Sequence, residues 1–312
     1  MIPRKPEPGY LQRHVSGELE ERAGRAYDLL RSCTVCPRKC GVNRLEDERG
    51  FCRTGLMPVI SSFGPHFGEE RPLVGRGGSG TIFVTHCNMA CCFCQNYGIS
   101  QCGQGQEVPP EKIAEMMIRL QKGGCHNINI VTPSHIVPQL VRSISIAAEQ
   151  GLAIPVVYNS GGYDSVETLR LLDGIVDIYM PDAKYGRNEI AQELSGAPGY
   201  VDVMKAAIRE MHRQVGDLAI VDGIAVRGLL VRHLVLPENL AGSDLVLPWL
   251  AEEISRETYV NIMDQYRPAG NVAADRDCNR YPALARSLSG QEYLHAVRIA
   301  AGCGLHRGLL HS

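Results

Sequence analysis

The feature that most constrains this fold is a short apolar strand that breaks directly into a cysteine-rich loop. Residues 81–96 read TIFVTHCNMACCFCQN, and the apolar run covers residues 82–84. The loop contributes three thiols with the spacing C-x3-C-x2-C: Cys87, Cys91 and Cys94. Three such thiolates can bind one soft metal centre, and thiolates select iron–sulfur clusters, zinc or Cu(I). A zinc site or a [4Fe–4S] site that is closed by protein alone takes four ligands. Three thiolates therefore leave one position open for another molecule.

This spacing, with the aromatic Phe93 directly before the last cysteine, resembles the signature of the radical S-adenosylmethionine (SAM) superfamily. The resemblance implies that the three cysteines hold a [4Fe–4S] cluster whose fourth iron binds the amino and carboxylate groups of SAM. It also implies reductive cleavage of SAM to methionine and a 5′-deoxyadenosyl radical, with the protein supplying position and electrostatics. A protein reductant such as ferredoxin or flavodoxin would deliver the electron. The residues alone leave two alternatives, a zinc knuckle and three buried free thiols.

A second group of four cysteines precedes the strand, in the stretch CTVCPRKCGVNRLEDERGFC: Cys33, Cys36, Cys40 and Cys52. Four thiols this close are a complete ligand set for zinc or for an auxiliary [4Fe–4S] cluster. We expect a second metal centre here, because so short a segment has little hydrophobic core of its own. The choice between zinc and a cluster stays open, and the crowded spacing favours the cluster slightly.

Length and charge limit the class of protein. The 312 residues predict two parts. Residues 1–79 would form an N-terminal helix and the Cys-rich metal-binding segment, and residues 80–312 a barrel with a C-terminal helix. The net charge of -2 gives no electrostatic reason to expect nucleic acid or an anionic membrane as a partner. The first residues lack the apolar region of a secretory signal, and no apolar run has the length of a membrane span. We therefore expect a cytoplasmic protein whose clustered cysteines bind metal.

Strand and helix signals alternate after the cysteine loop. Apolar runs predict five more strands, at residues 128–131, 155–158, 176–179, 229–236 and 259–263. Helical periodicity predicts intervening helices from Pro109 onward and at residues 136–150, 166–172, 201–215 and 245–254, with a last helix from Ser289. Asp164 with Glu167, and Ser289 with Glu292, are placed as capping boxes. The pattern predicts an α/β fold, a partial six-stranded parallel β/α barrel of TIM type that follows the small Cys-rich segment.

The N-terminal part gives weaker signals. We expect an extended arm at residues 1–15 and a helix capped by Ser16, with apolar positions from Leu19 to Leu30. Residues 53–80 are rich in glycine and proline, which predicts an irregular connection to the barrel.

Ligands of parallel β/α folds bind at the carboxyl ends of the strands, so the polar residues there are candidate SAM contacts. With Phe93, the candidates in strand order are Thr132, Ser134, Asn159, Asp182, Lys184, Arg232 and Gln265. Asp182 and Lys184 reproduce the Asp-x-Lys of glycyl-radical activating enzymes, and the resemblance implies that this pair holds the ribose and carboxylate of SAM. The alternative for the pair is a surface salt bridge of little energetic weight. The stretch TPSH, from Thr132, stands where much of the superfamily has Gly-Gly-Glu.

Residues 80–266 resemble an uncharacterised branch of the superfamily that is similar to pyruvate formate-lyase activating enzyme and has a Cys-rich N-terminal segment. The stretches that carry this likeness are PHFGEERPL, QNYGISQ and YVNIMDQYRP, besides the cysteines. The resemblance implies an enzyme that abstracts hydrogen from a substrate, with a protein glycine as one candidate and a small molecule as the other. A non-enzymatic iron–sulfur or zinc protein is the remaining alternative.

Overall fold

The centre of the molecule is an open parallel barrel. The computed structural model describes residues 7–273 and 281–309. Six strands pair in parallel in one continuous order: β2 (Ser79–Val84), β4 (Ile128–Val131), β5 (Val156–Ser160), β6 (Ile178–Pro181), β8 (Ile224–Leu234) and β9 (Tyr259–Met263). No pairing within the described residues joins β9 back to β2, so the barrel is partial. This confirms the fold expected from the sequence.

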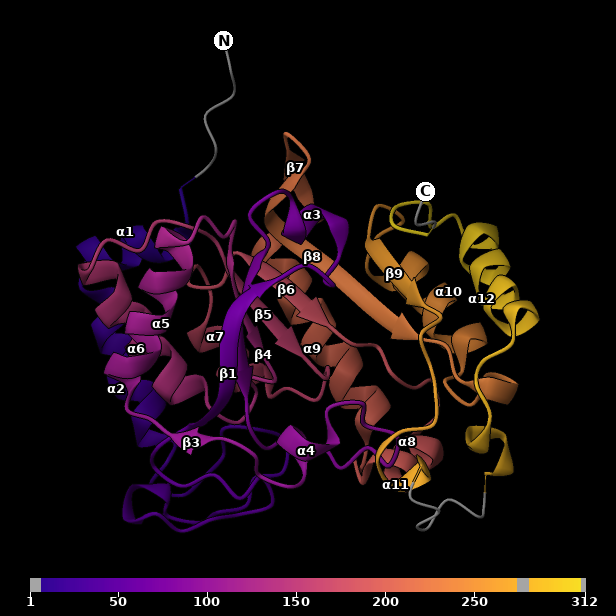
Figure 1. Ribbon diagram of the computed structural model, residues 1–312, viewed down its shortest axis with the longest axis horizontal. Coiled ribbons are helices and arrows are strands. Elements are labelled where there is room, and N and C mark those ends of the chain that lie inside the picture. The colour runs from indigo at the N-terminus through magenta and orange to yellow at the C-terminus, as the bar shows by residue number, and fades with distance from the viewer. Residues whose placement is uncertain (1–6, 274–280, 310–312) are drawn as a thin grey trace.

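Helices follow the strands and cover the outer face of the sheet (Figure 1). They are α5 (Pro110–Lys122), α6 (Val137–Glu149), α7 (Val166–Leu171), α9 (Tyr200–Val215) and α10 (Ser243–Glu253), and α12 (Gly290–Gly302) packs on α10. The capping box at Ser289 and Glu292 forms as expected, with both hydrogen bonds present. No helix in the described part of the chain has the length and apolar character needed to cross a membrane.

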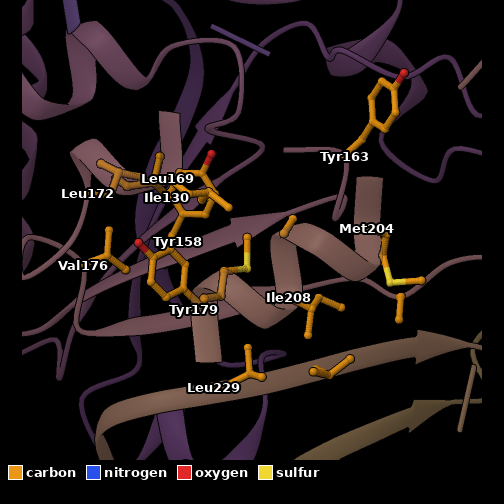
Figure 2. Packing of buried hydrophobic residues seen from close by; sticks show 14 of the residues in the cluster. Ile130, Tyr158, Tyr163, Leu169, Leu172, Val176, Tyr179, Met204, Ile208 and Leu229 are labelled. Carbon is orange, nitrogen blue, oxygen red and sulfur yellow. The ribbon is translucent and has the colours of Figure 1, made fainter. Parts of the chain in front are cut away.

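The main core lies between the sheet and these helices. Figure 2 shows Tyr158 and Tyr179, on neighbouring strands, packed edge to face with ring centroids 5.7 Å apart. Their hydroxyls find buried partners, because Tyr158 donates to Asp164 at 2.8 Å and Tyr179 donates to Gln214 at 2.6 Å. Alternate residues of a strand face opposite sides of the sheet. Tyr158 faces the helices, so the next residue on β5, Asn159, points into the barrel.

The N-terminal part is more regular than the sequence predicts. The region expected to be irregular contains β1 (Val59–His66), which pairs antiparallel with β2, and the short helix α3 (Arg71–Val74). The pairing was hidden by Gly64 and Pro65, which an edge strand tolerates. A two-residue strand, β3 (Gln106–Glu107), pairs with the outer side of β1.

The expected arm is also wrong in part, because residues 9–15 form helix α1 (Gly9–Val15). Tyr10 is fully buried and donates to the carbonyl of Ile154 at 2.9 Å, which fixes α1 to the barrel. Helix α2 (Glu18–Asp28) begins after Gly17, with no side-chain cap from Ser16, and packs on α6. The N-terminal segment therefore shares one core with the barrel.

Smaller differences lie at the helix starts and connections. Ser165, and not Asp164, caps α7, because Asp164 is buried and accepts from Tyr158 and Ser160. The sequence also gave no expectation of the hairpin strand β7 (Ala219–Val221) before β8 or of the helices α8 (Asn188–Ser195) and α4 (Tyr97–Ser100). In Figure 1, α4 and α8 lie with the short helix α11 (Gly270–Ala273) beside the carboxyl ends of the parallel strands, whereas α3 and β7 lie at the opposite end.

Candidate cofactor and metal site

The loop that carries the three cysteines is fixed from both sides. Backbone amides of Ala90 and Cys92 donate to the carbonyls of Ser195 and Leu194 at the end of α8, at 2.9 and 2.8 Å. The carbonyl of Cys92 in turn accepts from the amide of Val272 at 3.2 Å. The loop is thus held between α8 and α11 at the exit of β2, in a defined conformation.

Each of the three thiols has a hydrogen-bonding neighbour. Cys91 Sγ accepts from Ser195 Oγ at 3.0 Å, Cys94 Sγ lies 3.2 Å from Ser100 Oγ, and Cys87 Sγ accepts from the amide of Met89 at 3.3 Å. Burial raises the pKa of Cys87 well above its usual range, and the neighbouring thiol of Cys91 adds to the rise. Uncharged thiols are therefore favoured until a cation binds beside them, since a bound metal inverts this balance. Half-buried free thiols on a fixed loop fit the ligand set of an iron–sulfur cluster.

A chain of charged groups leads from the loop into the barrel. Lys184 pairs with Asp182, and Asp182 also accepts from Arg232 Nε at 2.8 Å. Burial raises the pKa of Asp182, but the charges of Arg232 and Lys184 outweigh it and hold this pKa below its usual value. The same guanidinium donates to Asn159 Oδ1 at 2.7 Å. Asp182 and Lys184 therefore do form the salt bridge that the sequence left as an alternative. The pair is buried, however, and does not lie on the surface.

The exits of β5 and β6 meet closely at Gly162. Its φ is 75°, and a Cβ there would lie 2.2 Å from the carbonyl oxygen of Asp182. Only glycine fits both conditions.

The charge of Lys184 reaches Cys91 and Cys87, where it opposes the rise in thiol pKa caused by burial. The Asp-x-Lys pair and the cysteine loop therefore belong to one site.

The exit of β4 has an unusual backbone. Thr132 has φ 65°, a left-handed conformation that β-branched residues rarely adopt, and its amide donates to the carbonyl of Asn159 at 2.8 Å. Strain of this kind gathers at functional sites. Ser134 does not join the group, because it is buried beside Asp164 on the helix side of the sheet. His135 is fully buried as well, and burial lowers its pKa to about 3.

A cavity of about 320 Å³ lies inside the barrel next to this group. Asn159, Arg232 and Met263 line it from the strands, Gln265 lines it from the exit of β9, and Asn96 lines it from the end of the cysteine loop. The carbonyl of Gln265 accepts from Gln95 Nε2 at 3.0 Å, which joins the exit of β9 to the loop. Phe93 does not face the cavity, since it is buried edge-on against Tyr266 with ring centroids 5.9 Å apart.

Sequence reasoning missed several residues of this site. Ser195 and Ser100 contact thiols, but single serines on unpredicted helices gave no signal. Glu69 and Glu70 line the cavity from the turn between β1 and α3. They lie in the quoted stretch PHFGEERPL, inside the region predicted to be irregular, and the two adjacent acidic residues were the signal that could have been singled out there.

The N-terminal cysteines lie on loops that are tied together by backbone hydrogen bonds, because the amide of Cys33 donates to the carbonyl of Val42 at 2.9 Å and the amide of Gly41 donates to the carbonyl of Cys33 at 3.1 Å. Three of them are less than a tenth exposed, and Cys40 is half-buried. Burial raises the pKa of Cys36 to about 12, and the charges of the other three thiols add to the rise. Among the described residues no three His, Cys, Asp or Glu side chains are gathered tightly enough for a single metal ion.

Arg38 connects this segment to the first cysteine loop. Its Nε donates to the carbonyl of Asn88 at 2.9 Å, and its guanidinium lies 3.6 Å from the centre of the Phe51 ring. Arg44 is fully buried beside the cysteines and donates to the carbonyls of Gly55 and His135 at 3.0 and 2.8 Å. The two cysteine groups are thus neighbours in space.

Comparisons with known proteins give a consistent result. Residues 81–226 match the family model described as Radical SAM superfamily. The chain is 32% identical over 283 residues to the uncharacterized protein MJ0674 of Methanocaldococcus jannaschii, covering 88% of this chain and 76% of that protein. It is 27% identical over 248 residues to a second uncharacterized protein of that organism, MJ0808, covering 72% and 68%.

Two of the solved structures to which this chain is similar have low sequence identity to it. Methylornithine synthase is 15% identical with a TM-score of 0.47, covering 93% of this chain and 72% of that one. The structure described as native anSMEcpe with bound AdoMet is 11% identical with a TM-score of 0.47, covering 70% and 57%.

Proposed function

This chain belongs to the radical SAM superfamily, and from that premise we propose that Cys87, Cys91 and Cys94 hold a [4Fe–4S] cluster at which SAM is reductively cleaved. When bound, the cluster and SAM together supply a 5′-deoxyadenosyl radical, which abstracts hydrogen from a substrate. The observation that carries the proposal is the fixed loop with three thiols, placed where the strands end and beside the buried pair of Asp182 and Lys184.

The chain's own residues would bind and orient SAM. Asp182, held ionised by two cations, would accept from the ribose hydroxyls, and Lys184 would donate to the carboxylate of SAM. Thr132 and Asn159 supply backbone and amide groups at the neighbouring exits. Arg232 orients Asp182 and Asn159 rather than standing free for an anion, and Gln265 closes the side next to the loop.

Two of the candidate contacts need a different role. Phe93 is packed against Tyr266, so we assign it to holding the loop that carries Cys94. Ser134 is buried on the helix side, so its contribution to SAM binding would be through the position of the β4 exit. The electron would come from a protein reductant such as ferredoxin or flavodoxin.

The substrate belongs to one of two classes. The resemblance to activating enzymes implies a protein glycine. The cavity inside the barrel favours a small molecule instead, because its volume of about 320 Å³ lies at the lower end of the range for small-ligand sites. We propose the small molecule. Deuterium transfer into 5′-deoxyadenosine from labelled metabolites or from labelled proteins separates the two classes.

We further propose that Cys33, Cys36, Cys40 and Cys52 bind a second metal centre that stabilises the N-terminal segment. The support is a set of four thiols, three buried and one half-buried, which have no disulfide partners within the described residues. Zinc and an auxiliary cluster both suit four thiolates, and elemental analysis distinguishes them.

Spectroscopy of the anaerobically reconstituted protein tests the main proposal. We expect the wild-type protein to give the EPR signal of a reduced [4Fe–4S] cluster that changes when SAM is added. The variant with Cys87, Cys91 and Cys94 all changed to Ala should lose the SAM-sensitive signal and keep any signal from the other four cysteines. A variant that still shows the SAM-sensitive signal would rule out this ligand set.

A further inference from the structure

Two adjacent carboxylates form the inner end of the cavity inside the barrel. Glu69 and Glu70 lie on the turn that joins β1 to α3 and face the strands from within. The Glu69 side chain is 8% exposed, and Glu70 is 5% exposed. Burial raises the pKa of Glu69, Arg232 opposes the rise, and the neighbouring Glu70 adds to it. Two buried acids side by side are costly unless cations or donors face them.

The partners among the described residues leave Glu70 incompletely satisfied. Glu70 Oε1 accepts from Asn261 Nδ2 at 2.8 Å, but Glu70 Oε2 has no hydrogen-bond partner among the described residues. Asn261 Oδ1, on the same side of the cavity, is another buried acceptor without a donor in that part of the chain. The cavity therefore has unused acceptors of hydrogen bonds.

Arg232 cannot neutralise all of the acids. Its Nε and one terminal nitrogen are used by Asp182 and Asn159, and its remaining nitrogen is 4.0 Å from Glu69. Lys184 pairs with Asp182. Asp182, Glu69 and Glu70 are three carboxyl groups facing the two permanent cations Arg232 and Lys184, and the nearest other basic group is His66, whose Nδ1 lies 3.3 Å from Glu69. A ligand that completes this site would carry a positive charge and donate hydrogen bonds.

The size and walls of the cavity favour an organic cation over a metal ion. Its volume of about 320 Å³ would hold roughly ten waters at liquid density, far more than one bare ion needs. Phe83, Val131 and Met263 form apolar wall on the strands, which suits an alkyl chain.

We propose that Glu70, with Asn261 beside it, binds the ammonium group of a small organic substrate, and that Glu69 adds the second negative charge. An ammonium donates three hydrogen bonds, which fits the unused oxygens of both residues. The opposite side of the cavity is lined by Asn96, two residues after Cys94, so the carbon chain of a substrate held at Glu70 extends toward the cysteine loop. This inference rests on the proposed function and names the substrate class.

Binding of simple probes to the full-length reconstituted protein in the presence of SAM tests it. The probes are n-pentylamine, protonated at neutral pH, its neutral analogue 1-pentanol and the anion pentanoate, each followed by ligand-observed NMR and by the shift in Tm. We expect n-pentylammonium to bind at least tenfold more tightly than either analogue. Glu70→Gln, which keeps the shape and removes the charge, should weaken n-pentylammonium binding about tenfold, whereas Glu111→Gln on the exposed face of α5 should leave it unchanged.

Several results would overturn the inference. They are equal binding of pentanol or pentanoate, an unchanged Kd in Glu70→Gln, and a Glu70-dependent stabilisation by KCl or MgCl2 alone that matches the amine. Loss of SAM binding in Glu70→Gln with amine binding intact would assign the carboxylate to SAM instead. If Glu70→Gln does not fold, Glu69→Gln replaces it.

Cleavage of SAM by the wild-type protein is measured in the same preparation. Absence of cleavage counts against the proposed function, and cleavage without selective ammonium binding counts against this inference alone.

Discussion

Asp182 is the residue on which the site's charges converge, because it holds Arg232 and Lys184 at once in a buried position. We expect Asp182→Asn to weaken SAM binding about tenfold or more, since a charged hydrogen bond contributes about 1.5–3 kcal/mol. Equilibrium binding of SAM to the reconstituted variant measures this, with iron content checked in parallel. Asp244→Asn is the matched control, because Asp244 pairs with Arg187 at 3.4 Å on the surface. If both variants bind SAM like the wild type, Asp182 has only a structural role.

Asp177 predicts a pH dependence of stability that is independent of any cofactor. It accepts backbone hydrogen bonds from Gly9 at 2.8 Å and Val156 at 3.0 Å, and burial raises its pKa to about 6. A carboxyl group whose pKa is higher in the folded state favours folding most below its unfolded pKa of about 3.9 and loses that contribution as the pH rises through about 6. A difference of about two between the folded and unfolded pKa corresponds to roughly 3 kcal/mol of folding free energy.

Chemical unfolding of the metal-free protein at pH 4 to 7 tests this expectation. The free energy of unfolding of the wild type should fall with rising pH relative to that of Asp177→Asn, which does not titrate. Parallel curves for the two proteins across this range would contradict the raised pKa.

The elements show where reading the sequence succeeded and where it failed. The strands at residues 128–131 and 259–263 were predicted with their observed bounds, because uninterrupted apolar runs mark buried parallel strands. β1 was missed, because Gly64 and Pro65 lie where the strand pairs with β2 alone and they interrupt the apolar pattern that marks a strand. The same error hid α3, and with it the two glutamates of the cavity. The three thiols were singled out from their spacing and the Asp-x-Lys pair from the family resemblance, whereas contacts such as Cys91 with Ser195 depend on tertiary packing.

Helix α3 closes the end of the barrel opposite the cysteine loop. Leu73 is fully buried there among Val157, Ile178 and Leu230. We expect Leu73→Ala to lower the free energy of unfolding by about 2–5 kcal/mol, the usual cost of emptying a buried leucine site. Leu294→Ala on α12 removes a leucine that is 48% exposed and should change it by less than about 0.5 kcal/mol. Equal effects of the two substitutions in urea unfolding would show that α3 does not close the barrel.

The four-cysteine segment gives a prediction about metal removal. We expect Cys36→Ser to lose one equivalent of bound zinc or of an iron–sulfur cluster, because Cys36 lies among the other three thiols. Hydrogen exchange at residues 33–52 should then become faster, since metal binding contributes to the folding of such a segment. Cys102→Ser, which changes an exposed cysteine, serves as the control. Unchanged metal content and unchanged hydrogen exchange in Cys36→Ser would contradict a second metal centre at these four cysteines.

At the scale of the whole molecule, the open barrel brings together residues that are far apart in the chain. The cysteine loop, the Asp-x-Lys pair and the β9 exit meet at one end, and the N-terminal segment supplies both the second cysteine group and the acidic end of the cavity. The partial barrel and its open end were predictable from alternating strands and helices. The contribution of residues 59–74 to its interior was not, because no local pattern specifies which long segment enters a barrel.

The central claim is that this assembly cleaves SAM, and the formation of 5′-deoxyadenosine tests it most directly. Reconstituted protein would be incubated anaerobically with SAM and a one-electron reductant, and 5′-deoxyadenosine and methionine would be measured together by chromatography. We predict that both products form in equal amounts with the wild-type protein and that neither exceeds background when Cys87, Cys91 and Cys94 are replaced by Ala. Wild-type protein that holds an intact, reduced cluster and binds SAM, yet forms neither product, would contradict the account.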